Sequence, residues 1–182
     1  MDAHRIVFLA KNDPYTAPTL EFVWVRIVSD GLVPVVFYDG SVRCLEDFHA
    51  CMQDGGTLPF VMSSNAGKII MFCWLNCIEG VTARIHFTFF KDSWGRKRDA
   101  LGYAKAMLRH VLTRRDSAGY VLDTVVGMTP VSNPLAVRFV QAAGMQKVGF
   151  IPHGAVLHYE GSQPVDAVLT VATRDSLGVT EE

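Results

Sequence analysis

The 182-residue sequence has few cysteines and no long hydrophobic run. No apolar stretch approaches the roughly 20 residues that a helix needs to cross a bilayer, so we expect no membrane partner. The four cysteines, Cys44, Cys51, Cys73 and Cys77, form no CxxC pair, and no pair of histidines follows them at a zinc-site spacing. We therefore expect no metal site, and cysteines that are reduced and mostly packed in the interior.

Internal repeats, low-complexity tracts and a strong net charge are also missing. The formal net charge is -1 at pH 7, and 49% of the residues are hydrophobic. This composition favours one ordered domain over residues 1–182, with a frayed tail at residues 175–182. The start, MDAHRIVFLAKND, has an acidic second residue and only a short apolar run, which predicts no signal peptide and a cytoplasmic protein.

The charges are unevenly distributed along the chain. Residues 1–57 hold 4 Lys and Arg against 8 Asp and Glu, whereas residues 91–115 hold 8 basic and 2 acidic residues. The short basic segment is typical of a local anion site and not of a general nucleic-acid binder, so we expect no nucleic-acid partner. The acidic first third would attract a cationic ligand.

The first third of the chain is the hardest part to assign. Residues 4–10 predict a strand, and residues 19–30 predict an amphipathic helix capped by Thr19, although their β-branched residues leave a strand possible. Residues 44–53 resemble a short helix. The aromatic side chains of this region are expected to build the core and one wall beside a bound ligand. They are Phe22, Trp24, Tyr38 and Phe48.

The middle of the chain predicts an antiparallel meander. Strands are expected at residues 58–64, 68–80 and 82–90, joined by short turns. The last strand alternates, with Ile85, Phe87 and Phe89 on one face and Arg84, His86 and Thr88 on the other.

The second half alternates helices and strands. A helical stripe begins at Ala100, and a strand follows at residues 120–128. A second helix is expected after Ser132 or Asn133, with Pro134 in its first turn, Gly144 at its end and a buried stripe that includes Leu135. Two closing strands complete an α/β (α+β) fold with a single mixed, mostly antiparallel central sheet flanked by helices.

The segment SWGRKR, residues 93–98, joins a predicted strand to the start of a helix. The first N–H groups of a helix lack intrahelical partners, and the helix dipole adds positive potential, so such a junction suits a phosphate group. Arg96, Lys97 and Arg98 add three cations. The alternative is that these side chains merely solvate a helix end.

The order of elements and two segments resemble the GNAT superfamily of acyl-CoA-dependent N-acetyltransferases over residues 4–173. TARIHFTFFKDSWGRKRDALGYAKAML takes the place of the family's strand, pyrophosphate loop and helix. NPLAVRFVQAAGMQKVGF is similar to the family's helix after the fifth strand, in the version that begins with Asn. The phosphate-loop motif is divergent, because the segment holds only Gly95 where relatives carry a second small residue.

The resemblance implies acetyl-CoA as cosubstrate and an amine as acceptor. It implies that two central strands splay apart, that the pantetheine arm fills the gap, and that Asn133 bonds this arm; a simple helix cap is the alternative. The positions implied to bind the cofactor are Phe89, Ser93, Trp94, Gly95, Arg96, Lys97, Arg98 and Asn133.

The implied reaction is attack of a neutral amine on the acetyl thioester. His86 is the first candidate for the base because an ordinary imidazole titrates near 6.5, although a strand histidine is more often a sheet-surface residue. Asp123 and Glu79 are weaker candidates, and Ser132 can assist. The family's usual proton-donating Tyr is missing from residues 121–158. Backbone N–H groups near Phe89, in a strand opened by a bulge, would stabilise the oxyanion.

Two functions therefore stay open at this point. The first is an N-acetyltransferase with an unknown amine acceptor, and the second is a catalytically silent GNAT-like module that binds CoA or a protein partner. Exposed strand edges would permit a homodimer.

Overall fold

The structure is a computed structural model that describes residues 4–93 and 97–179. Trp94, Gly95 and Arg96 of the expected phosphate loop lie outside the described residues, as do the side chains of Lys97 and Arg98.

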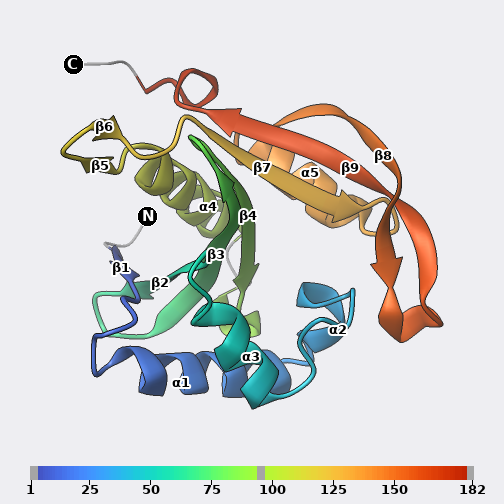
Figure 1. Ribbon diagram of the computed structural model, residues 1–182, viewed down its shortest axis with the longest axis horizontal. Coiled ribbons are helices and arrows are strands. Elements are labelled where there is room, and N and C mark those ends of the chain that lie inside the picture. Colours follow the sequence, from blue (N-terminus) through green and yellow to red (C-terminus); the bar gives the residue numbers. More distant parts are fainter. Residues whose placement is uncertain (1–3, 94–96, 180–182) are drawn as a thin grey trace.

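The centre of the molecule is a 7-stranded sheet with the order β1-β2-β3-β4-β7-β9-β8 (Figure 1). Its strands are β1 His4–Phe8, β2 Leu58–Ser64, β3 Ile69–Glu79, β4 Thr82–Phe89, β7 Thr124–Pro130, β8 Gln146–Leu157 and β9 Gln163–Thr173. Strands β4 and β7 pair in parallel, and the other neighbours pair antiparallel. The predicted mixed, mostly antiparallel sheet is confirmed.

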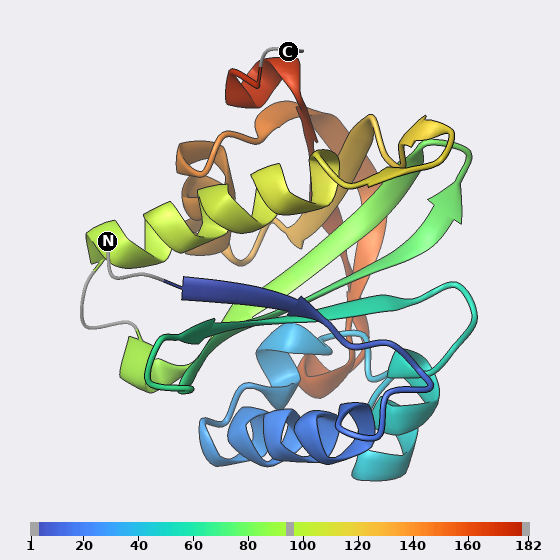
Figure 2. The same ribbon diagram turned by 90° about the vertical axis from the view of Figure 1, so that its left-hand side faces the viewer.

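Helices cover both faces of the sheet. Helices α1 (Thr16–Ser29), α2 (Val33–Val36) and α3 (Leu45–Met52) lie on one side, and α4 (Lys97–Leu112) and α5 (Pro134–Ala142) lie on the other (Figure 2). The parallel pairing of β4 and β7 requires a crossover, and α4 supplies it. A small hairpin, β5 (Arg115–Asp116) and β6 (Gly119–Tyr120), lies between α4 and β7.

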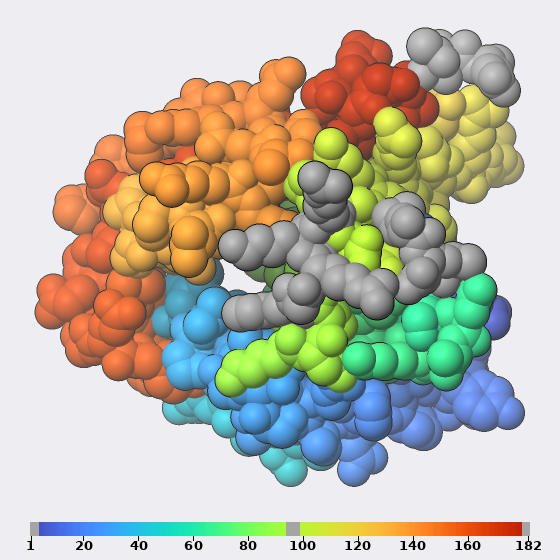
Figure 3. Space-filling view, turned by 180° about the vertical axis from the view of Figure 1, so that it is seen from behind, coloured from blue at the N-terminus to red at the C-terminus, as the bar shows by residue number. Residues whose placement is uncertain are grey.

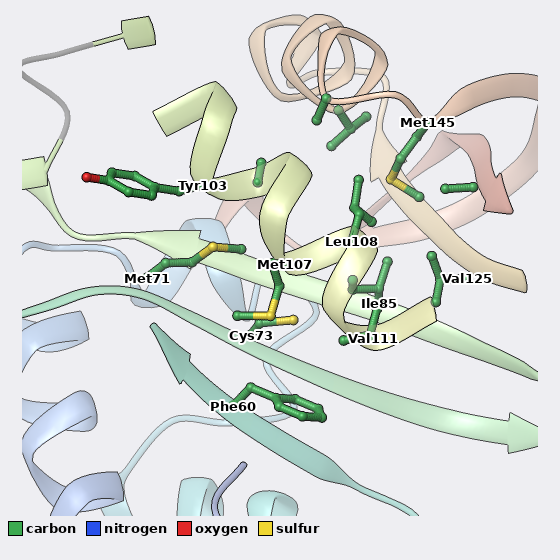
Figure 4. Close-up of a cluster of buried hydrophobic side chains, with 14 of the residues drawn as sticks. Phe60, Met71, Cys73, Ile85, Tyr103, Met107, Leu108, Val111, Val125 and Met145 are labelled. Atoms are coloured by element: carbon green, nitrogen blue, oxygen red, sulfur yellow. The ribbon is translucent and has the colours of Figure 1, made fainter. Parts of the chain in front are cut away.

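The core has two clusters because successive strand residues point to opposite faces. Met71, Cys73 and Ile85 pack under α4 with Met107 and Leu108 (Figure 4). On the other face, residues of β2 and β3 pack against α1 and α3 in an aromatic cluster. Its rings include Trp24, Phe37, Phe48, Phe72 and Trp74. The expected core role of Trp24 and Phe48 is confirmed, whereas Phe22 is half exposed.

Three local predictions are wrong. Helix α1 begins at Thr16, before the predicted start, and the Asp13 carboxylate accepts the Tyr15 N–H (2.8 Å) in the turn that precedes it. Thr19 lies inside the helix, where its Oγ1 donates to the Tyr15 carbonyl (2.7 Å). Leu135 lies outside the buried stripe of α5, since it is 75% exposed.

The expected packing of the cysteines and the expected frayed tail also need correction. Cys73 is buried, Cys51 is partly buried, and Cys44 and Cys77 are exposed. Residues Asp175–Leu177 form a 3-10 helix, in which Leu177 is buried and its carbonyl accepts a hydrogen bond from Arg109 (3.1 Å). The chain is therefore packed against the core through this turn.

Candidate active site

Strands β4 and β7 pair over only part of their length. Their parallel register runs from Thr82 opposite Thr124 to Arg84 opposite Val126. Beyond that point β4 continues to Phe89, still paired with β3, and β7 continues to Pro130, still paired with β9. The two strands therefore diverge at the centre of the sheet, as the resemblance implied.

The backbone of β4 exposes polar groups to this gap. Val81, just before β4, accepts the Thr124 N–H of β7 (3.2 Å), whereas the Phe90 N–H donates to Ile70 of β3 (3.3 Å). Because alternate residues of a strand direct their backbone groups to the same side, the odd-numbered residues face β7. The N–H and C=O groups of Phe87 consequently point into the gap beyond the last β4–β7 pair.

This opening does not come from the bulge expected near Phe89. The β3–β4 register is regular from Asn76 opposite Arg84 to Met71 opposite Phe89, and its irregularity lies between Asn76 and Glu79. The Phe89 side chain is buried against the Phe139 ring of α5, with 5.6 Å between the ring centroids. The gap arises because β7 leaves β4 to follow β9.

A cavity of about 370 Å³ fills the gap. It is lined by residues 85–88 of β4, residues 127–130 of β7, the start of α5, helix α2, and Tyr38, Trp74, Leu157 and Glu160. Figure 3 shows the hollow from behind, between the orange segment around α5 and the blue segment around α2. Segments far apart in the sequence thus meet around one space that opens to solvent.

Asn133 stands where α5 meets this cavity. Its Oδ1 accepts the Ala136 N–H (3.1 Å), which confirms the predicted helix cap. The Nδ2 group makes no hydrogen bond to any part of the chain that the structure describes. Because Asn133 and Ala136 both line the cavity, the side chain can cap the helix through oxygen and donate to a ligand through nitrogen.

His86 lies on the cavity wall in a constrained setting. Its ring stacks on Trp74, with 4.6 Å between centroids and 2° between planes, and its Nε2 lies 3.1 Å from Asn76 Oδ1. Burial, and to a smaller extent the Arg84 charge, lower the pKa of His86 to about 4, against the opposing effect of the Asp39 charge. The imidazole is therefore neutral near pH 7 and binds a proton weakly.

Tyr38 and Glu160 complete the end of the cavity opposite α5. The His158 N–H donates to the Tyr38 carbonyl (2.7 Å), which joins the loop after α2 to the 3-10 helix His158–Glu160. Burial, followed by the Asp39 charge, raises the pKa of the Tyr38 phenol, so this hydroxyl stays protonated at neutral pH.

Sequence reasoning placed Tyr38 on an acceptor-side wall but did not find Glu160. Glu160 carries no local motif, and the fold brings it to the cavity through the distant hairpin of β8 and β9. The glycine at position 40 allows the two segments to meet closely. Its φ is +72°, and a Cβ there would lie 2.5 Å from His158 Cγ.

The other predicted catalytic residues separate in space. Ser132 lines the cavity together with His86. Asp123 does not; its Oδ1 accepts a hydrogen bond from Arg174 (2.6 Å), whose guanidinium also donates to the Leu122 carbonyl (2.8 Å) and stacks on Tyr120. This ion pair joins the end of β9 to the start of β7, so Asp123 has a structural role.

The chain before the expected phosphate loop is held by ion pairs. Asp92 forms ion pairs with Arg26 (2.8 Å) and Lys68 (3.1 Å), and its carboxylate accepts a hydrogen bond from Ser93 Oγ (3.3 Å). Burial raises the pKa of Asp92, but the hydrogen bonds from Lys68 and Arg26 outweigh this and lower it below its ordinary value. Ser93 thus lies at the entrance of the loop and outside the cavity lining.

The described residues hold neither a metal-binding cluster nor a membrane-spanning helix. Within residues 4–93 and 97–179, no group of three or more His, Cys, Asp or Glu side chains is placed to hold a metal ion. Among the helices of the described chain, none has the length and apolar character needed to cross a membrane.

The fold is similar to those of several solved acetyltransferases. The spermidine N-acetyltransferase of Vibrio cholerae, solved with CoA and spermine, superimposes with a TM-score of 0.70 at 13% identity, over 96% of this chain and 97% of that one. Aminoglycoside acetyltransferase AAC(6')-Ib, solved with coenzyme A and kanamycin, superimposes with a TM-score of 0.68 at 14% identity, over 99% of this chain and 100% of that one.

A third similar structure, an acetyltransferase from Acinetobacter baylyi called putative in its description, gives a TM-score of 0.65 at 16% identity over 95% of this chain and 94% of that one. No protein-family model and no curated protein sequence matches the chain. The chain therefore has the GNAT fold along nearly its whole length, at sequence identities that establish the fold alone.

Proposed function

We propose that the protein is an acyl-CoA-dependent N-acetyltransferase that moves an acetyl group from acetyl-CoA to an amine. The divergence of β4 and β7 carries this proposal, because it opens a cavity through the middle of the sheet and exposes backbone hydrogen-bonding groups along it. An extended amide-bearing arm such as pantetheine can pair with these groups as a strand would.

The hydrogen-bonding groups around the cavity fit acetyl-CoA. Phe87 C=O on β4 and Asn133 Nδ2 at the start of α5 are the groups that would bond the arm. The basic residues of positions 96–98, where the chain enters α4, would receive the phosphates. Acetyl-CoA would supply the acetyl thioester.

The residues on the cavity wall suggest how the reaction proceeds. A backbone N–H directed at the thioester oxygen stabilises the negative charge that develops there, and Phe87 offers such a group. Neutral His86 can accept a hydrogen bond from the attacking amine and orient it. The protonated phenol of Tyr38 is a candidate donor to the departing thiolate.

The acceptor would enter beside Tyr38 and Glu160. The carboxylates of Glu160, on the cavity wall, and of Asp39, which acts electrostatically on both Tyr38 and His86, favour a cationic molecule at this end. Spermidine and kanamycin, which occur in the names of the similar structures, are suitable first probes.

Two measurements test the function together. Isothermal titration calorimetry with acetyl-CoA and with desulfo-CoA measures cofactor binding, and release of free thiol in the presence of an amine panel measures turnover. A ligand that binds only the folded state stabilises it by roughly 2.7 kcal/mol at a hundredfold excess over Kd, so Tm should also rise. Binding without turnover would favour the catalytically silent module, and a Tm insensitive to millimolar CoA would overturn both the acetyltransferase and a module that binds CoA.

A further inference from the structure

Asn76 is a polar residue near the active site that the proposed mechanism leaves without a role. It lies on β3, opposite Arg84, and is the last residue of the regular β3–β4 pairing before the irregularity at Asn76 and Glu79. Its side chain is partly buried, and its Oδ1 lies 3.1 Å from Nε2 of His86.

The strand register explains why these two side chains meet. Trp74 lies directly opposite His86, and Asn76 is two residues further along β3, so all three project from the same face of the sheet. Trp74 is 3% exposed and stacks on Phe72 and Phe37 as well as on His86. The imidazole is consequently held by a rigid ring below it and an amide at its edge.

We propose that Asn76 is a positioning residue that holds His86 in the Nε2–H tautomer, so that Nδ1 is the ring atom that accepts a hydrogen bond from the amine acceptor. A neutral imidazole has one N–H, and an amide oxygen can only accept. The contact between Oδ1 and Nε2 therefore places the proton on Nε2 and the lone pair on Nδ1. The role of the amine rests on the proposed function, whereas the tautomer does not.

The charges around His86 agree with a neutral ring. Arg84 on its own strand disfavours the imidazolium, and Asp39 in the loop after α2 favours it. Tyr38 and Glu160 also line the cavity, and β3 contributes only the uncharged Trp74 and Asn76 to this contact. Replacing the amide at position 76 with a carboxylate would shift this balance towards the protonated ring.

The first experiment needs no substrate. Nitrogen-15 NMR of the imidazoles of the full chain at pH 7, with the His86 signals assigned by the loss of signal in His86→Gln, is expected to show the Nε2–H tautomer. An Nδ1–H tautomer, or an even mixture of the two, would overturn the proposal.

The second experiment uses variants at position 76. Asn76→Asp is nearly isosteric and is expected to raise the pKa of His86 by roughly 1 unit or more, moving the acid limb of the kcat/KM profile to higher pH by the same amount. Asn76→Leu is expected to lower kcat by roughly tenfold or more while the KM for acetyl-CoA is unchanged. Asn65→Asp, in the exposed turn between β2 and β3, is the matched control.

The outcomes separate this proposal from the proposed function. A wild-type pH profile in Asn76→Asp, together with a wild-type kcat in Asn76→Leu, would overturn the positioning role even if the enzyme acetylates amines. If no amine is acetylated, the proposed function fails, and the NMR tautomer alone decides whether Asn76 orients His86. Should Asn76→Leu fail to fold, the Asp variant and the tautomer of the wild type decide the question.

Discussion

Substituting Asn133 with Asp separates a structural from a ligand-binding role of this side chain. Asn133 Oδ1 caps α5 by accepting the Ala136 N–H (3.1 Å). Asp supplies an oxygen of the same reach, and its negative charge is favoured at a helix N-terminus by about 0.3–1 kcal/mol. We therefore expect the Tm of Asn133→Asp to equal or slightly exceed that of the wild type, as measured by differential scanning calorimetry.

Acetyl-CoA affinity is expected to respond in the opposite way. The substitution removes the Nδ2 donor of Asn133, which makes no hydrogen bond to the residues that the structure describes. It also places a carboxylate beside a cavity that we propose to hold an anionic cosubstrate. Loss of such a donor costs roughly 1–3 kcal/mol, and about 1.4 kcal/mol is a factor of ten. Calorimetric titration should therefore show that the affinity for acetyl-CoA falls by about tenfold or more.

Asn133→Ala provides the control, because it removes both the cap and the donor. Loss of the cap is expected to reduce the free energy of unfolding by about 1 kcal/mol, so this variant should lose stability as well as affinity. The reasoning is refuted if a well-folded Asn133→Asp protein binds acetyl-CoA as tightly as the wild type. Asn133 would then be a helix cap and nothing more.

Three further predictions concern the cavity wall and its supports. The pKa of His86 is about 4 in the folded chain against an ordinary 6.5, so the unfolded chain binds the proton first and the free energy of unfolding falls as pH falls. His86→Gln should reduce this fall between pH 7 and 4 by up to about 3 kcal/mol, as measured by urea titration. An unaltered dependence on pH would contradict the burial of the ring. Gly40→Ala places a methyl group against His158 at a φ of +72°. The variant should lower the free energy of unfolding by roughly 1–3 kcal/mol and raise the KM for the amine but not for acetyl-CoA. Wild-type stability and kinetics would show that this close contact is dispensable. Asp123→Asn should lower Tm and leave kcat unchanged, because Asp123 pairs with Arg174 away from the cavity; a large fall in kcat at unchanged Tm would instead assign it a catalytic role.

Much of the fold follows from signals within single elements. Pro134 in the first turn of α5, the cap at Asn133 and the glycine after its last turn bound that helix, and all three are readable from neighbouring residues. The alternation of β4 predicted that Ile85, Phe87 and Phe89 share one face, and in the structure Ile85 and Phe89 are buried in one core cluster while Phe87 packs against it. Caps, turns and periodicity act over a few residues, so the sequence alone determines them.

The same local signals were misleading where distant parts of the chain decide. Leu135 fits the apolar period of α5 but is exposed, because the period does not say how far the neighbouring elements extend over a helix. Asp123 has the chemistry of a base, yet Arg174, 51 residues away, pairs with it. A side chain's partners depend on which strands are neighbours, and that information is not local.

The active site is decided almost entirely by tertiary structure. His86 was identified from its residue type and strand, but its stacking on Trp74, its contact with Asn76 and its lowered pKa result from the register of β3 against β4 and from burial. The cavity itself exists because β7 leaves β4 to pair with β9. The sequence by itself determined the strands of the central sheet, α4, α5 and most of the faces that they bury, whereas α2 and the hairpin of β5 and β6 were not predicted. Only the packing of the whole sheet decided which polar groups share one space, because burial and strand pairing are properties of the assembled chain.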